Sequence, residues 1–177
     1  MLVDDVRTIG VAIAIPDPWG SDLQERRATY GDRQAWTIPT HVTLLPPTQV
    51  RKDQMRSVDA HLAAVADAQV RFGIELGAAD TFRPVTPTVF LRLARGADEC
   101  ALVADLVRSG PLRRRLVFPY HPHVTLAFDV ADEQLDRAFS EHANFRLDFT
   151  ASEFSRYELA EEGIWLPERN FPFGGED

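Results

Sequence analysis

The tetrapeptide His-Val-Thr-Leu occurs twice in this chain, at positions 41–44 and 123–126. The first copy lies in the run HVTLL, which Pro46 and Pro47 follow, and the second lies in HVTLAF at 123–128. Chance is a poor explanation, because a random second copy is expected on the order of a few times in a thousand. Both runs are short and apolar, which is typical of buried strands that proline or a polar turn ends.

The segments around the two copies repeat the same order of strand and helix. Hydrophobic periodicity and helix-end signals predict, in the first half, a strand at 8–15, a helix at 17–31, a strand at 41–45, a helix at 49–70 and a strand at 72–76. The second half is predicted to contain a strand at 88–93, a helix at 97–109, a strand at 123–128, a helix at 132–141 and a strand at 145–149. Two closing strands are expected at 153–159 and 163–171. The pattern indicates an internal pseudo-duplication within a single domain spanning 1–177.

Composition and charge restrict the location and the partners. The net charge of −8 argues against a long nucleic acid, which binds through many phosphates to a basic face. The segment Met1 to Arg7 carries Asp4 and Asp5 where a secretory signal needs basic residues, and the apolar run that follows is too short to span a bilayer. The single Cys100 cannot form an internal disulfide. We therefore expect a cytoplasmic protein, a monomer, without a membrane partner.

Each copy of the motif offers one imidazole and one hydroxyl on the same face of a strand, because side chains two residues apart point the same way. If the halves pack about an approximate two-fold axis, His41, Thr43, His123 and Thr125 meet at one centre. One neutral and one protonated imidazole can serve as general base and general acid, and the hydroxyls can donate to phosphoryl oxygens. These four residues are the candidate catalytic set, and no metal or cofactor is expected.

The paired H-x-T-x motifs resemble those of the two-histidine phosphoesterases, specifically the bacterial 2′-5′ RNA ligase or RNA 2′,3′-cyclic phosphodiesterase group. The runs YHPHVTLAF at 120–128 and TFRPVTPTVFLRL at 81–93 resemble the same group. The resemblance implies an α+β fold in which two pseudo-symmetric lobes of mostly antiparallel sheet with outer helices, approximately 8–76 and 88–149, flank a central active-site groove. Members of this group often carry a basic residue just after the second motif, where this chain has Phe128.

The same resemblance implies an activity. The expected reaction is metal-independent hydrolysis of a 2′,3′-cyclic phosphate, at the end of a nucleotide or short RNA, to a 2′-phosphomonoester. The reverse 2′-5′ ligation is a further possibility that the resemblance brings with it.

Three alternatives stay open from the sequence. The first is an enzyme with the same four residues that acts on another phosphoester, such as a linear 2′-5′ or an ADP-ribose-type bond. The second is a nucleotide- or RNA-binding module that has the groove without turnover. The third is a zinc hydrolase built on the H-x-H pair His121 and His123, although no nearby carboxylate or thiol completes a tetrahedral set.

Several residues outside the motifs are candidate substrate contacts. Tyr120 and Phe82, together with Trp36 and Trp165, are potential platforms for stacking a base, although core packing is the alternative for each. The basic cluster at 113–115, with Arg115 as the candidate, could steer a phosphate toward the second motif or lie in a solvated loop.

Overall fold

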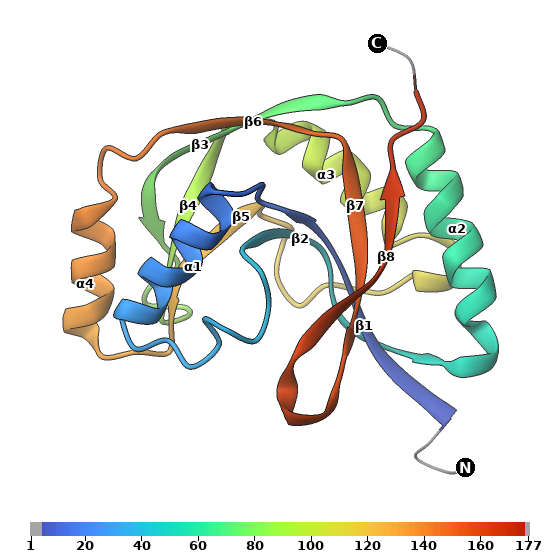
Figure 1. Cartoon of the computed structure of the whole chain (residues 1–177), viewed down its shortest axis with the longest axis horizontal. Helices are drawn as coiled ribbons and strands as arrows, with labels where there is room; N and C mark the ends of the chain where they lie inside the picture. The colour runs from blue at the N-terminus through green and yellow to red at the C-terminus, as the bar shows by residue number, and fades with distance from the viewer. Residues whose placement is uncertain (1–4, 176–177) are drawn as a thin grey trace.

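The computed structural model describes residues 5–175 and contains two four-stranded antiparallel sheets with helices packed around them (Figure 1). The strand order is β2-β1-β7-β8 in the first sheet and β5-β4-β3-β6 in the second. The strands are β1 (Val6–Ala14), β2 (His41–Arg51), β3 (Phe72–Thr81), β4 (Thr88–Arg95), β5 (His123–Phe128), β6 (Leu147–Ala151), β7 (Glu153–Leu159) and β8 (Trp165–Pro172). The helices are α1 (Trp19–Thr29), α2 (Met55–Asp67), α3 (Ala97–Val107) and α4 (Asp132–Glu141). The expected α+β class and antiparallel lobes are confirmed.

The two motif strands, β2 and β5, each form the edge of their own sheet, and these edges contact one another. The helix that precedes each motif crosses to the other half of the molecule. Helix α1 packs against β5, and α3 packs against β2. In Figure 1, α1 and α4 accordingly lie on the side of the second sheet, whereas α2 lies beside β8. The exchange places each half against the motif strand of the other.

Buried side chains of both motif strands anchor them in the core. Val42 and Leu44 of β2, and Val124 and Leu126 of β5, are each fully buried. Burying an aliphatic side chain of this size contributes about 1.5–3 kcal/mol, so the alternate faces of these strands are fixed in place. The polar residues between them are therefore directed away from the core.

Helix α1 begins later than the predicted residue 17. Asp17 precedes the helix, and its carboxylate accepts hydrogen bonds from the amide and hydroxyl of Ser21, at 3.1 Å and 2.7 Å. Gly20 allows a close approach to the preceding strand, because a Cβ at this position would lie 2.3 Å from the carbonyl oxygen of Ile15. These contacts fix the direction in which α1 crosses to β5.

The prediction that Pro46 and Pro47 end the first motif strand is wrong. Strand β2 continues through both prolines to Arg51, and residues 49–51 pair with β1, so helix α2 starts at Met55 rather than at 49. Proline is tolerated because β2 is an edge strand. On its outer side no strand of the described residues pairs with it, so a missing amide hydrogen costs no hydrogen bond between strands.

The first lobe, predicted at 8–76, does not end with a strand of its own sheet. Strand β3 pairs with β4 and β6 in the second sheet, and the closing strands β7 and β8 complete the first. Alternating hydrophobicity predicts a strand but carries no information about its partner, which long-range packing decides. The lobes are therefore not contiguous along the chain.

The predictions about a secretory signal and a membrane span concern the N-terminal segment and the helices. Residues 1–4 lie outside the described residues, so the interpretation of the N-terminus as lacking a signal has no structural counterpart. No helix within residues 5–175 has the length and apolar composition needed to cross a bilayer.

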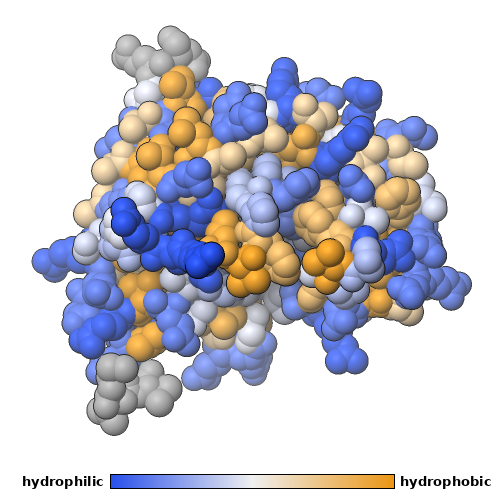
Figure 2. All heavy atoms as spheres, turned by 180° about the vertical axis from the view of Figure 1, so that it is seen from behind, coloured by the Kyte–Doolittle hydropathy of each residue, from blue (hydrophilic) through white to orange (hydrophobic). Residues whose placement is uncertain are grey.

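Seen from behind, the surface has several apolar patches separated by hydrophilic residues (Figure 2). The large exposed hydrophobic side chains include Trp36, Val117 and Phe118.

Candidate active site

The two motif strands show the same pattern of burial over six residues. In both, the histidine and the threonine are half-buried, and the valine and leucine between and after them are buried. His41 and Thr43 therefore share one face of β2, and His123 and Thr125 share one face of β5. The predicted pairing of an imidazole with a hydroxyl in each motif follows from the strand geometry.

Both motif strands also contain the same irregularity after the threonine. The register with the neighbouring strand skips one residue, Leu44 in β2 and Leu126 in β5. An extra residue of this kind shifts the alternation by one position. The sixth residue of each run, Pro46 or Phe128, is consequently half-buried on the same side as the histidine and threonine. A strict period of two does not predict this position.

A backbone carbonyl fixes each imidazole in the same way. The Nδ1–H of His41 donates to the carbonyl of Pro39 at 2.8 Å, and the Nδ1–H of His123 donates to that of His121 at 2.7 Å. In the neutral ring this places the proton on Nδ1 and leaves Nε2 as an acceptor. In the first motif, Nε2 of His41 lies 3.1 Å from Oγ1 of Thr43. Each ring can therefore exchange a proton through Nε2.

Burial lowers the pKa of both histidines. The pKa of His41 falls to about 4, chiefly through burial, with the positive charges of Arg27 and His123 adding to the effect and the hydrogen bond to Pro39 opposing it. The pKa of His123 is also lowered by burial, against the hydrogen bond to His121. Because the charge of His123 acts on His41, the two imidazoles lie within electrostatic range of one another. Both are neutral near pH 7.

The loop at 108–122, which leads into the second motif, fastens the first motif strand. The Tyr120 hydroxyl donates to the carbonyl of Thr43 at 2.8 Å. Burial raises the pKa of Tyr120 well above its usual range, so the phenol stays protonated and remains a donor. The guanidinium of Arg108 covers the Tyr120 ring, with Cζ 4.7 Å from its centroid. Arg114 adds bonds to the carbonyl of Pro47 and the hydroxyl of Thr48.

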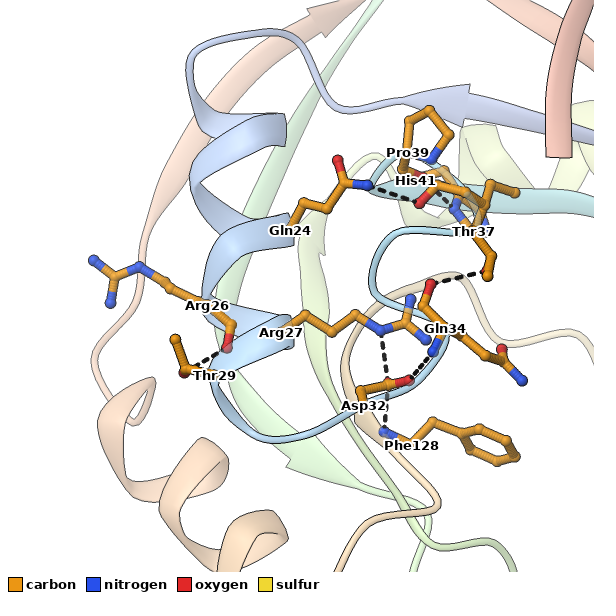
Figure 3. A network of polar contacts seen from close by, with 11 residues as sticks. Gln24, Arg26, Arg27, Thr29, Asp32, Gln34, Thr37, Pro39, His41 and Phe128 are labelled. Carbon is orange, nitrogen blue, oxygen red and sulfur yellow. Dashed lines mark hydrogen bonds and ion pairs between the residues drawn. The ribbon is translucent and has the colours of Figure 1, made fainter. Parts of the chain in front are cut away.

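The loop at 30–40, which leads into the first motif, fastens the second motif strand (Figure 3). Asp32 Oδ2 accepts the amide hydrogen of Phe128 at 2.9 Å, and Oδ1 accepts that of Gln34 at 2.8 Å. The same carboxylate pairs with Nε of Arg27 at 2.7 Å. Each motif strand is thus held at its outer edge by the loop that carries the other histidine. Sequence patterns do not single out Asp32, since its contact with Phe128 joins segments 96 residues apart, and Arg27 is held in turn by Asp32.

The candidate substrate contacts outside the motifs have different surroundings. The Phe82 ring stacks on Phe90 and meets the ring of His123 edge-on, with 5.0 Å between centroids, so Phe82 lies beside the site. Tyr120 bonds the backbone of β2 rather than presenting an open stacking face. Arg115 is exposed and makes no hydrogen bond or ion pair within the described chain. Substrate contact by Phe82, Tyr120 and Arg115 stays a prediction.

The zinc alternative gains no additional ligand from the fold. The rings of His121 and His123 lie 6.3 Å apart, and one Nδ1 of the pair is already bonded to a carbonyl. Within residues 5–175, no group of three or more His, Cys, Asp or Glu side chains is arranged to hold a metal ion. Cys100 is buried, and burial raises the pKa of its thiol to about 12.

Replacing Tyr120 by phenylalanine tests the fastening of β2. Loss of one part-buried hydrogen bond is expected to lower the free energy of unfolding by about 0.5–1.5 kcal/mol. Amide hydrogen exchange along β2 should accelerate by up to about tenfold. Tyr157→Phe, which truncates another buried tyrosine, serves as the control and should leave exchange in β2 unchanged. Equal exchange in β2 for Tyr120→Phe and wild type would contradict the assignment.

Comparisons with known proteins show the family and the fold of this chain. A sequence model of the 2′-5′ RNA ligase superfamily matches residues 15–162. A Halalkalibacterium halodurans protein provisionally named a phosphoesterase is 27% identical over 126 residues, which cover 71% of this chain and 72% of the relative. The structure of E. coli LigT with 3′-AMP matches with a TM-score of 0.72 at 17% identity, and that with NADP+ with a TM-score of 0.69 at 17% identity. Each covers 97% of this chain and 100% of LigT, which shows the fold. Because the family match spans most of the sequence, the chain belongs to the 2′-5′ RNA ligase superfamily.

Proposed function

We propose that this protein hydrolyses 2′,3′-cyclic phosphate ends of nucleotides or short RNA to 2′-phosphomonoesters, without a metal ion, with His41 and His123 as its acid–base pair. Membership of the superfamily supports phosphoester hydrolysis or ligation in general. The observation that carries the finer proposal is the matched pair of imidazoles. Each is fixed at Nδ1 by a carbonyl two residues earlier, each leaves Nε2 for proton transfer, and each shares a strand face with a threonine.

We assign the base to His41 and the acid to His123. Burial lowers the pKa of His41 to about 4, so its Nε2 is unprotonated and can accept a proton near neutral pH. It removes a proton from water as the water oxygen bonds to phosphorus. The bond from phosphorus to the ribose 3′ oxygen breaks, and protonated His123 donates a proton from Nε2 to that oxygen. Thr43 and Thr125 donate hydrogen bonds to the nonbridging oxygens as negative charge builds.

The nucleotide substrate class has support from structural relatives. E. coli LigT, which shares the fold, has been solved with 3′-AMP and with NADP+, both nucleotides. The net charge of −8 favours a small ligand over a long nucleic acid. We extend the proposal to a monomer that works in the cytoplasm on nucleotides or short RNA ends. Reverse 2′-5′ ligation by the same residues stays part of the proposal as a secondary activity.

Turnover of 2′,3′-cyclic nucleotides in excess chelator tests the proposed reaction. The wild type should release 2′-phosphomonoesters, and His41→Ala or His123→Ala should each lower kcat/KM by about 10²–10⁴-fold, the contribution of a positioned acid or base. His61→Ala serves as the matched control, because His61 lies on α2 and bonds the carbonyl of Val107.

The outcomes separate this proposal from its alternatives. Activity that survives in both motif variants would contradict the acid–base assignment. Activity that disappears in chelator would point to the zinc alternative. A wild type that binds 2′,3′-cyclic nucleotides without product would favour the binding module, and turnover of only linear 2′-5′ or ADP-ribose-type substrates would favour the other phosphoester.

The lowered pKa values predict an acidic optimum for kcat/KM. This parameter reports the free enzyme, which needs one imidazole neutral and the other protonated. Since both pKa values lie below the usual 6.5, the required protonated imidazole is lost as the pH rises toward neutrality. We expect kcat/KM to rise from about pH 4, to reach its maximum below pH 6.5 and to decline above it. A maximum above pH 7 in a steady-state profile would contradict the assignment.

A further inference from the structure

Arg27 is a buried cation with most of its hydrogen-bonding capacity unused. The side chain is only 9% exposed, and Nε is its single partnered donor within the described residues, in the 2.7 Å pair with Asp32. Neither Nη atom has a protein partner there, and neither belongs to the fully buried unpartnered atoms of the described residues, so the Nη edge reaches solvent. Four N–H donors are therefore left for a ligand.

The direction of Arg27 relates it to the motif histidines. In Figure 3 the guanidinium extends from α1 toward the segment that leads into His41, on the side of Phe128. The carboxylate that holds Nε also accepts the amide of Phe128, so one side chain links Arg27 to the end of β5. The charge of Arg27 also acts on the imidazole of His41. Arg27 is thus linked through Asp32 to the end of β5, and its charge reaches the imidazole of His41.

Neither motif carries a fixed positive charge among its own six residues, 41–46 and 123–128. Both imidazoles are neutral near pH 7, and the sixth residue on the face is Pro46 in one motif and Phe128 in the other. A phosphodiester carries a full negative charge, which a half-buried site accommodates poorly without a cation. A permanent charge from a guanidinium meets this need.

We propose that Arg27 binds the phosphoryl group of the substrate through its Nη donors, and that Asp32 holds Arg27 in place for this purpose. The inference rests on the proposed function, because it places a phosphoester between the two motifs. The binding cation then comes from α1, the helix that crosses to β5, rather than from either motif strand. Asp32 occupies only Nε, which leaves the Nη edge available for two hydrogen bonds to phosphate oxygens.

Arg92 is the rival source of positive charge. It pairs with His123 across β4 and β5, so the two residues lie on the same face of the sheet. Its side chain, however, lies over Gly77 of β3, with Nε 3.4 Å from the position that a Cβ would occupy there. The Arg92 side chain therefore turns toward β3, away from β5, and it is exposed to solvent.

The test measures binding of inorganic phosphate and turnover of 2′,3′-cyclic nucleotides in parallel. Phosphate binding is followed through the imidazole NMR signals of His41 and His123, a readout that does not need turnover. Arg27→Gln should weaken phosphate binding and lower kcat/KM by about 10–100-fold, as expected for a charged hydrogen bond. Arg27→Lys should retain part of the binding. Arg26→Gln on the exposed face of α1 is the matched control and should match wild type.

A second variant separates binding from folding. Arg27→Gln leaves Asp32 as an unpaired buried charge and could destabilise the chain, whereas Arg27→Met with Asp32→Asn removes both charges together. This double variant should remain folded by its thermal transition and still show the loss of phosphate affinity. Phosphate affinity equal to wild type in either variant would overturn the proposal, and a loss confined to Arg92→Gln would assign the role to Arg92.

The two proposals fail in different ways. If wild type binds phosphate through Arg27 but does not turn over cyclic nucleotides, the reaction is wrong and the role of Arg27 holds. If wild type hydrolyses cyclic nucleotides and Arg27→Gln does so equally well with unchanged phosphate affinity, the reaction holds and the role of Arg27 is overturned. A wild type that neither binds phosphate nor shows turnover overturns both.

Discussion

The hydrogen bonds that fasten each motif strand to the opposite half hold the site together. Tyr120 reaches the carbonyl of Thr43 at 2.8 Å, and Asp32 accepts the amide of Phe128 at 2.9 Å. An edge strand without such partners would leave backbone groups unpaired. Because each fastening residue precedes the other histidine in the chain, the position of one imidazole depends on the strand that carries the other. The edges of two separate sheets are thereby held in contact with one another.

The same packing sets the electrostatics. Burial keeps both imidazoles neutral, and the carbonyls of Pro39 and His121 direct their Nε2 atoms away from the backbone. A bound anion would raise the pKa of a neighbouring imidazole and favour its protonated form. Binding of an anionic substrate would therefore favour the protonated imidazole that the proposed general acid requires. Arg27 adds a permanent charge that does not depend on pH.

The sequence predicted the paired motifs well and the connections between them poorly. The repeat of HVTL identifies the shared face of His41 and Thr43 because strand periodicity is a local property. It does not reveal that β3 joins the second sheet, or that β2 continues through two prolines, because strand pairing and edge position are set by distant segments. Asp32 likewise gives no signal in the sequence, since its partner Phe128 lies 96 residues away. The stacking role expected of Tyr120 stays untested, although its hydroxyl has a structural contact.

The central claim is that both histidines face one phosphoryl group. It is tested most directly by titrating the protein with a nucleoside–vanadate complex, whose five-coordinate vanadium imitates the transition state of phosphoryl transfer. The imidazole resonances of His41 and His123 are followed together by NMR. The account predicts one equivalent bound per chain and a single saturation curve for both resonances. A response of only one imidazole, or two curves with different midpoints, would contradict a shared site.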